Sequence, residues 1–234
     1  MSRPQGAPVA LLGGTFDPVH YGHLRPAVEL LEALCLAEIR LVPGHVPPHR
    51  PQPRLDAPAR AGLLDTAVAG IPGLVVDRCE LDRPGPSYTV DTLEHLRRSL
   101  GDQRPLCFIM GWDAFRGLMR WHQWQRLAAL AHLVVVTRGG DTQALAPALD
   151  EWMRARRVRD PAALRASPSG HVLFQAVSRL EISATGIRRC LALGYSAQGL
   201  MPDAVWHELA LRGCYGYPQI SRAITPGRLN PRHV

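Results

Sequence analysis

The stretch GGTFDPVHYGHL, residues 13–24, decides how the chain folds, because it joins an apolar run to an amphipathic segment. The run at residues 8–13 predicts a buried strand, and apolar residues between 24 and 35 recur at the three- and four-residue spacing of a helix. The two glycines between them lack a Cβ, so they let the backbone turn sharply and let a ligand approach closely. A strand, a glycine turn and a helix in this order predict a βα unit.

The rest of the chain repeats this alternation. Short apolar runs predict five more strands, at residues 38–43, 74–81, 105–111, 132–138 and 171–177. Amphipathic stretches predict further helices at residues 57–69, 89–100, 123–131, 184–193 and 203–212. We therefore expect an α/β fold of the Rossmann-like, doubly wound type, with a mostly parallel sheet of strand order 3-2-1-4-5 and flanking helices.

The composition fits one globular domain. The chain has 234 residues, of which 46% are hydrophobic and 20% charged, which disfavours a disordered chain, a collagen or a coiled coil. We expect residues 1–217 to form the domain, with a candidate insertion at 139–170, C-terminal helices within 184–212 and a loosely held tail at 218–234. No apolar run reaches the length of a membrane span, and the first residues lack the apolar core of a signal peptide.

The cysteines and the charge bear on location and partners. Five widely spaced cysteines disfavour a disulfide framework or a zinc site and favour a cytoplasmic protein. The formal net charge is +7, and every one of the 27 cationic side chains is arginine, whose planar fork suits phosphate. Drift in a GC-rich genome also explains the missing lysine. A basic module that binds nucleic acid is the alternative from another class, but the arginine cluster at 154–159 has no interleaved aromatic residues, so we expect no nucleic-acid partner.

Two histidines mark the start of the first predicted helix. A helix start presents N–H groups and the positive end of the helix dipole, which together favour a phosphate near His20 and His23. Gly22 leaves room between the two imidazoles for a nucleotide. Simple helix capping is an alternative, and so is a metal site, although no further ligand stands at a suitable spacing, so we expect no protein-held metal. The stretch matches neither the P-loop nor a GxGxxG fingerprint.

The H-x-G-H string at residues 20–23 resembles the signature of the adenylyltransferase superfamily that includes the class I aminoacyl-tRNA synthetases. The stretch GGTFDPVH, residues 13–20, resembles that of bacterial nicotinate-nucleotide adenylyltransferases. Four more stretches agree in order: VPPHR at 46–50, SYT at 87–89, GWD at 111–113 with Trp121, and ISATGIR at 182–188. The resemblance spans about residues 8–215. It implies transfer of the adenylyl group of ATP to nicotinate mononucleotide, giving nicotinate adenine dinucleotide and pyrophosphate, without a covalent enzyme intermediate.

The resemblance also implies roles for particular residues. The implied catalytic residues are His20, His23 and Arg188. The implied ATP-binding residues are Gly13, Gly14, Thr15, Phe16, His20, Gly22, His23, Gly111, Asp113, Arg138, Ile182, Ser183, Thr185 and Arg188. The implied mononucleotide-binding residues are Thr15, His45, His49, Arg50, Ser87, Tyr88, Thr89 and Trp121. Mg²⁺ is expected to arrive with ATP and to bridge its phosphates.

Some of these residues also have structural interpretations. Ser183 is a routine N-cap candidate with Arg188 in solvent, Asp113 is another cap candidate, and Trp121 is compatible with partial core burial. His132, before a predicted strand, is expected to be structural.

The acceptor is the least determined part of the prediction. Many relatives carry Asn where this chain has Gly44 or His45, at the start of a proline-rich stretch, 44–58, that we expect to be a binding loop. Phosphopantetheine, flavin mononucleotide and nicotinamide mononucleotide are alternative acceptors. Trp121 and the PPHR run disfavour the first two. The choice between nicotinate mononucleotide and its amide stays open. The oligomeric state stays open as well.

Overall fold

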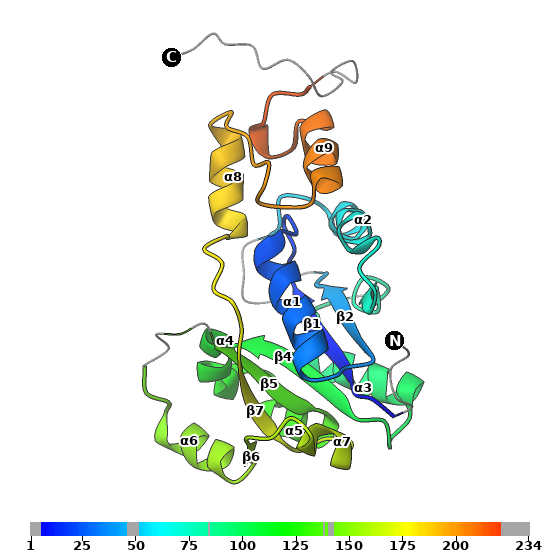
Figure 1. Ribbon diagram of the computed structural model, residues 1–234, viewed down its shortest axis with the longest axis vertical. Coiled ribbons are helices and arrows are strands. Elements are labelled where there is room, and N and C mark those ends of the chain that lie inside the picture. Colours follow the sequence, from blue (N-terminus) through cyan, green and yellow to red (C-terminus); the bar gives the residue numbers. More distant parts are fainter. Residues whose placement is uncertain (1–5, 46–51, 84, 138, 140–142, 221–234) are drawn as a thin grey trace.

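The computed structural model describes residues 6–45, 52–83, 85–137, 139 and 143–220. Within these residues, seven parallel strands form one sheet in the order β3-β2-β1-β4-β5-β7-β6 (Figure 1). The strands are β1 (Val9–Gly14), β2 (Glu38–Pro43), β3 (Leu74–Val76), β4 (Leu106–Gly111), β5 (His132–Thr137), β6 (Arg157–Val158) and β7 (Val172–Ala176). The expected Rossmann-like α/β fold is confirmed, including the 3-2-1-4-5 order of its first strands.

Helices cover both faces of the sheet. They are α1 (Tyr21–Ala33), α2 (Ala57–Val68), α3 (Thr89–Leu100), α4 (Trp112–Arg116), α5 (Leu127–Leu130), α6 (Pro147–Arg154), α7 (Ala163–Ala166), α8 (Ala184–Ala192) and α9 (Asp203–Leu211). Successive strand residues point to opposite faces: Ala10 packs in the core under α1, whereas Val9 and Leu11 pack in the core under α3. The sheet is therefore the middle of three layers, and its strands are apolar on both sides, as buried parallel strands require.

Two predicted elements differ clearly from the observed ones, and one observed strand was not predicted. The strand predicted at 74–81 stops at Val76, because the Asp77 carboxylate accepts a hydrogen bond from the Cys79 N–H at 3.0 Å and turns the chain. The helix predicted at 123–131 is a 3₁₀ turn, η2 (Trp124–Arg126), followed by α5, with Gln123 before it at a left-handed φ of 49°. Strand β6 was not predicted, since two residues carry no periodic pattern.

The second half of the chain is placed around this sheet. The segment proposed as an insertion, 139–170, carries α6, β6 and α7, and β6 extends the sheet by pairing with β7. Helices α8 and α9 and the 3₁₀ turn η3 (Cys214–Gly216) gather with α2 at the end of the molecule toward which β1 and β2 run (Figure 1). The limits 1–217 and 218–234 stay predictions, and residues 221–234 lie outside the described part.

Candidate functional site

The loop between β1 and α1 brings the two signature histidines together. His20 is buried at the N-cap of α1, and its imidazole stacks on that of His23 with 3.8 Å between ring centroids. The Phe16 ring meets His23 edge-on at 5.0 Å. The predicted phosphate loop therefore presents two adjacent imidazoles at the positive end of a 13-residue helix, a setting that favours an anion.

Gly13 and Gly14 lie at the end of β1 and not in a turn. Gly13 and Gly14 belong to β1 and pair with Val42 and Pro43 of β2, so the expected sharp turn at these glycines is wrong. The left-handed residue is Phe16, with a φ of 49°. What Gly14 does provide is space, because a Cβ there would lie 2.9 Å from the Phe16 ring.

Gly22 allows a close approach between two helix starts. A Cβ at this position would lie 2.8 Å from the His20 Nδ1 atom and 2.8 Å from the carbonyl oxygen of Ile182. Ile182 directly precedes Ser183, the N-cap of α8, whose hydroxyl accepts a hydrogen bond from the Gly186 N–H at 3.1 Å. The predicted cap at Ser183 is thus present, and the starts of α1 and α8 lie against each other.

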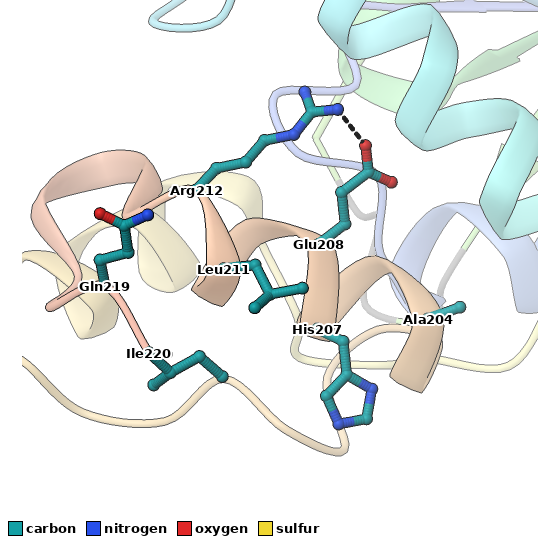
Figure 2. Close-up of a pocket in the computed structure, with 7 residues that line it drawn as sticks. All are labelled: Ala204, His207, Glu208, Leu211, Arg212, Gln219 and Ile220. Carbon is teal, nitrogen blue, oxygen red and sulfur yellow. Dashed lines mark ion pairs between the residues drawn. The ribbon is translucent and has the colours of Figure 1, made fainter. Parts of the chain in front are cut away.

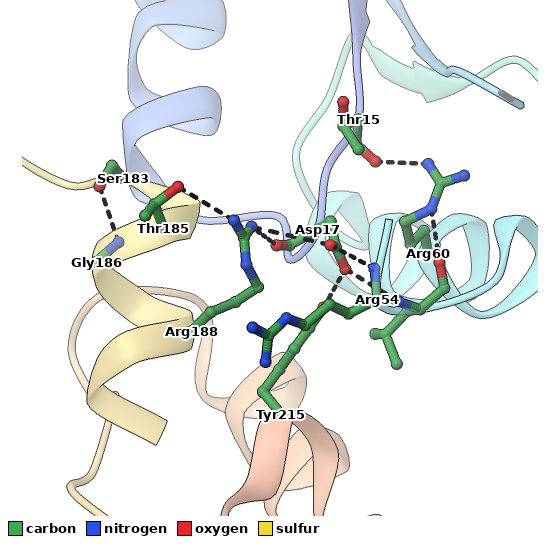
Figure 3. A network of polar contacts seen from close by, with 10 residues as sticks. Thr15, Asp17, Arg54, Arg60, Ser183, Thr185, Gly186, Arg188 and Tyr215 are labelled. Carbon is green, nitrogen blue, oxygen red and sulfur yellow. Dashed lines mark hydrogen bonds and ion pairs between the residues drawn. The ribbon is translucent and has the colours of Figure 1, made fainter. Parts of the chain in front are cut away.

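Arg188 joins the same two elements. Its guanidinium donates to the Asp17 carbonyl at 2.7 Å and to the Thr185 hydroxyl at 3.1 Å, and it lies 3.8 Å from the Asp17 carboxylate (Figure 3). One quarter of its side chain is exposed. The structure therefore places the positive charge of Arg188 against Asp17 of the phosphate loop; its contact with ATP stays a prediction.

Asp113 lies at the end of the neighbouring strand. β1 and β4 are adjacent and parallel, so Gly14 and Gly111 are at the same edge of the sheet, where α/β proteins bind ligands. The N-cap of α4 is Gly111, so the interpretation of Asp113 as a cap is wrong. Its side chain is 98% exposed, with Arg116 at 3.9 Å, which leaves the carboxylate open to a ligand hydroxyl.

The candidate acceptor residues come from two segments that touch. Tyr88, directly before α3, packs on His122 with 4.5 Å between ring centroids. The adjacent Trp121 is half-buried and meets Phe108 of β4 edge-on at 6.0 Å. Trp121 therefore packs partly against the core, as its structural interpretation has it, while its stacking on a substrate ring stays a prediction. His122 was not predicted. His49, Arg50 and Arg138 lie outside the described residues.

A half-buried carboxylate, that of Glu80, lies next to this acceptor region. Glu80 accepts a hydrogen bond from the Thr92 hydroxyl at 2.7 Å, and Thr92 accepts one from Arg83 at 2.9 Å. Burial raises the pKa of Glu80 above its ordinary value. A Cβ on Gly44 would lie 3.6 Å from the second Glu80 oxygen, so Glu80 lies close to the end of β2 while it binds Thr92 of α3.

The most important residues that the sequence reasoning missed are Asp17, Arg60 and Tyr215. All three are buried, and they contact one another's segments around the phosphate loop. Asp17 lies within the motif at residues 13–24, so its position in the sequence could have indicated its importance. Arg60 and Tyr215 carried none, because their partners are distant in sequence.

A pocket of about 660 Å³ lies along α9 (Figure 2). Its lining residues are Ala204, His207, Glu208, Leu211, Arg212, Gln219 and Ile220. None of them is a predicted site residue, and an ion pair of 2.5 Å joins Glu208 to Arg212 within it. The candidate site is therefore at the sheet edge and not in this pocket. Across the described ranges, no three His, Cys, Asp or Glu side chains gather as metal ligands, and no helix is long and apolar enough to cross a membrane.

Several solved structures have the same fold as this chain. A structure titled Plasmodium falciparum nicotinic acid mononucleotide adenylyltransferase complexed with NaAD matches with a TM-score of 0.67 and 13% identity, covering 90% of this chain and 98% of that one. The same protein complexed with APC matches with a TM-score of 0.66 over the same shares. At this low identity the likeness concerns the fold.

Sequence relatives are much closer. The family model described as cytidylyltransferase-like matches residues 11–190. A protein of Halorhodospira halophila named "probable nicotinate-nucleotide adenylyltransferase" is 52% identical over 91% of this chain and 97% of its own length. Proteins of the same name from Chromohalobacter salexigens and Yersinia enterocolitica are 49% and 47% identical over 92% and 88% of this chain, and 97% and 94% of their own lengths. The chain therefore belongs to the nicotinate-nucleotide adenylyltransferase family.

Proposed function

We propose that this protein transfers the adenylyl group of ATP to nicotinate mononucleotide, releasing pyrophosphate and nicotinate adenine dinucleotide. The observation that carries the chemistry is the pair of stacked imidazoles, His20 and His23, at the start of α1 and beside the start of α8. The name shared by the closely related proteins supports the choice of substrates. The reaction belongs to the biosynthesis of NAD.

The transfer needs positioning more than it needs a reactive side chain. An oxygen of the mononucleotide phosphate attacks the α-phosphorus of ATP, a new P–O bond forms, and the bond from the α-phosphorus to the bridging oxygen breaks. The attacking phosphate is already ionised at neutral pH, so no protein nucleophile is required. The protein contributes by holding two polyanions in line and by stabilising the charge that develops on the α-phosphate and the leaving pyrophosphate.

The phosphate loop supplies groups suited to that charge. We assign the phosphates of ATP to the imidazoles of His20 and His23, with Arg188 adding a positive charge from α8. The N-terminal ends of α1 and α8 add the positive ends of two helix dipoles. The exposed Asp113 carboxylate is suited to accept hydrogen bonds from the ribose of ATP.

The acceptor side is assigned to Trp121 and the SYT segment. A half-buried tryptophan offers one rigid face for stacking on a flat pyridine ring. Thr89, at the first position of α3, and its backbone are suited to contact the ring substituent. His45, together with His49 and Arg50, is proposed to contact phosphate.

The cation of this reaction is proposed to enter on its substrate. The imidazoles and the guanidinium around the phosphate loop suit phosphate oxygens better than a hard cation, and the buried Asp17 carboxylate already accepts three hydrogen bonds from the protein. Mg²⁺ bound to ATP would bridge its phosphates and neutralise part of their charge. A cytoplasmic location is proposed as well, supported by five cysteines that are all free thiols.

The test is a product assay with a choice of acceptors. Pure protein, ATP and Mg²⁺ are incubated with nicotinate mononucleotide, with its amide, with flavin mononucleotide or with phosphopantetheine, while pyrophosphate release and the dinucleotide are measured. We expect the highest kcat/KM with the nicotinate acid, and we expect His23→Ala to lower kcat by about 100-fold or more with an unchanged fold.

Two outcomes would contradict this assignment. Absence of an adenylylated product with every acceptor would refute the reaction, and preference for another acceptor would refute the substrate. Tight nucleic-acid binding with a steep salt dependence and no turnover would instead favour the non-enzymatic alternative.

A further inference from the structure

Arg60 is a buried cation, and its hydrogen bonds to the described residues all go to backbone carbonyls. Only 1% of the residue is exposed. Its guanidinium donates to the carbonyl of Thr15 at 2.6 Å, of Gly44 at 2.8 Å, of Leu55 at 3.2 Å and of His45 at 3.3 Å. One planar fork thus joins the loop after β1 to the end of β2 and to the segment before α2.

Asp17 binds the same region from the other side. Its buried carboxylate accepts hydrogen bonds from the N–H groups of Arg54 at 2.9 Å and Leu55 at 3.3 Å. It also accepts one from the Tyr215 hydroxyl at 2.6 Å (Figure 3). Burial raises the pKa of Tyr215, so its phenol keeps the proton that it donates.

The position of these contacts matters for the proposed reaction. Thr15 lies in the loop that we assign to ATP, whereas Gly44 and His45 lie on the side that we assign to the mononucleotide. A guanidinium that binds carbonyls of both segments sets the separation of the two sides. Burying a cation without a hydrogen-bonded carboxylate is unfavourable, and well-packed apolar residues usually serve stability at least as well. The placement of Arg60 therefore points to a role in positioning the two segments relative to each other.

We propose that Arg60 and Asp17 are positioning residues of the adenylyl transfer. They hold the ATP loop and the end of β2 at the separation at which the two phosphates meet in line. Neither residue needs to touch a substrate. The proposal rests on the proposed function. It predicts that changing either residue lowers kcat even under conditions in which the variant is folded.

The test compares two buried arginines of the same kind. Arg97 is also buried, and its guanidinium also binds backbone carbonyls, those of Arg104, Pro168 and Leu130 at 2.5–2.6 Å, at the far end of α3. Lysine keeps the charge of either residue and loses the planar fork. The variants Arg60→Lys and Arg97→Lys are compared for unfolding midpoint, kcat and both KM values, at a temperature where both are folded.

We expect both variants to unfold more easily. Arg60→Lys is expected to lower kcat by about 10- to 100-fold, because a misplacement of about 1 Å has an effect of this size, while KM for ATP changes less. Arg97→Lys is expected to keep kcat within about twofold of the unaltered protein, because its carbonyl partners lie outside the two loops. Equal kcat values for the two variants would overturn the proposal.

A second pair covers the case in which Arg60→Lys fails to fold. Tyr215→Phe removes only the hydroxyl that donates to Asp17, whereas Tyr217→Phe alters a neighbouring ring that packs on Trp206. We expect kcat to fall by several-fold in the first variant and to stay unchanged in the second. Unchanged kcat in both would overturn the role of Asp17. Failure of the unaltered protein to make the dinucleotide refutes the proposed function itself, so the two failures are distinct.

Discussion

Replacing Gly22 by alanine should damage the site although alanine is the better helix former. The added Cβ would stand 2.8 Å from His20 Nδ1 and 2.8 Å from the Ile182 carbonyl oxygen, both closer than van der Waals contact. Ile182 contributes backbone, which cannot rotate away, so either α8 or the His20 ring must move. Overpacking of this kind costs about 1–3 kcal/mol, and the helix propensity gained from Gly to Ala offsets at most about 1 kcal/mol.

We therefore expect Gly22→Ala to lower the unfolding free energy by about 1–2 kcal/mol. In a protein of this length each 1 kcal/mol shifts Tm by about 2–4 °C, so the loss is measurable in a thermal scan. We also expect kcat to fall at least about tenfold, because the displaced imidazole belongs to the pair that faces the phosphates. Pyrophosphate release at saturating ATP measures this.

Gly62→Ala is the matched control, since Gly62 lies inside α2 and a Cβ there would meet no atom within 4 Å beyond its chain neighbours and the backbone of its own helix. The same change of residue should raise stability by about 0.5–1 kcal/mol there and leave kcat unchanged. If Gly22→Ala behaved like Gly62→Ala, with a higher Tm and full activity, the contact between the two helix starts would not be what limits this position.

Further predictions concern the acceptor, the pH dependence and a helix cap. Trp121→Ala should raise KM for the mononucleotide more than KM for ATP in steady-state assays, because it removes the proposed stacking face; equal changes would indicate packing alone. Burial lowers the pKa of His132 to about 4, below its ordinary 6.5, so protonation of the unfolded chain should reduce stability as the pH falls from 6.5 to 4, by roughly 2–3 kcal/mol at pH 4.5. Urea unfolding of the unaltered protein and of His132→Gln should show a smaller decline in the variant. Ser183→Ala removes the hydroxyl that accepts from Gly186 and should destabilise the protein by about 1 kcal/mol in the same assay, whereas Ser183→Thr should retain most of that stability.

The parts of the fold that were predictable are those with a repeated local pattern. The strand at 38–43 and the helix at 89–100 have the predicted bounds, because apolar residues recur through their whole length. The turn after β1 was misplaced, since glycine favours a turn without requiring one, and here the left-handed residue is Phe16. The expected structural role of His132 agrees with its burial and with its hydrogen bond to the Ser167 carbonyl at 2.9 Å.

The candidate site divides in the same way. Motif residues such as His20 and His23 could be found because a helix start has recognisable chemistry. Arg60 could not, because its partners are main-chain carbonyls, which any residue type provides. Nothing in the sequence near Tyr215 indicates that its hydroxyl binds Asp17, since that pairing depends on the complete path of the chain.

The bond between Tyr215 and Asp17 spans 198 residues, nearly the whole chain. During translation the first βα unit leaves the ribosome long before its partner is made. Contacts of such long range close late, because the entropy of the intervening chain opposes them until the intermediate elements have folded. The phosphate loop therefore reaches its final shape only after Tyr215 has been synthesised, so that a chain terminated before this residue carries the signature without the hydrogen bond that supports it.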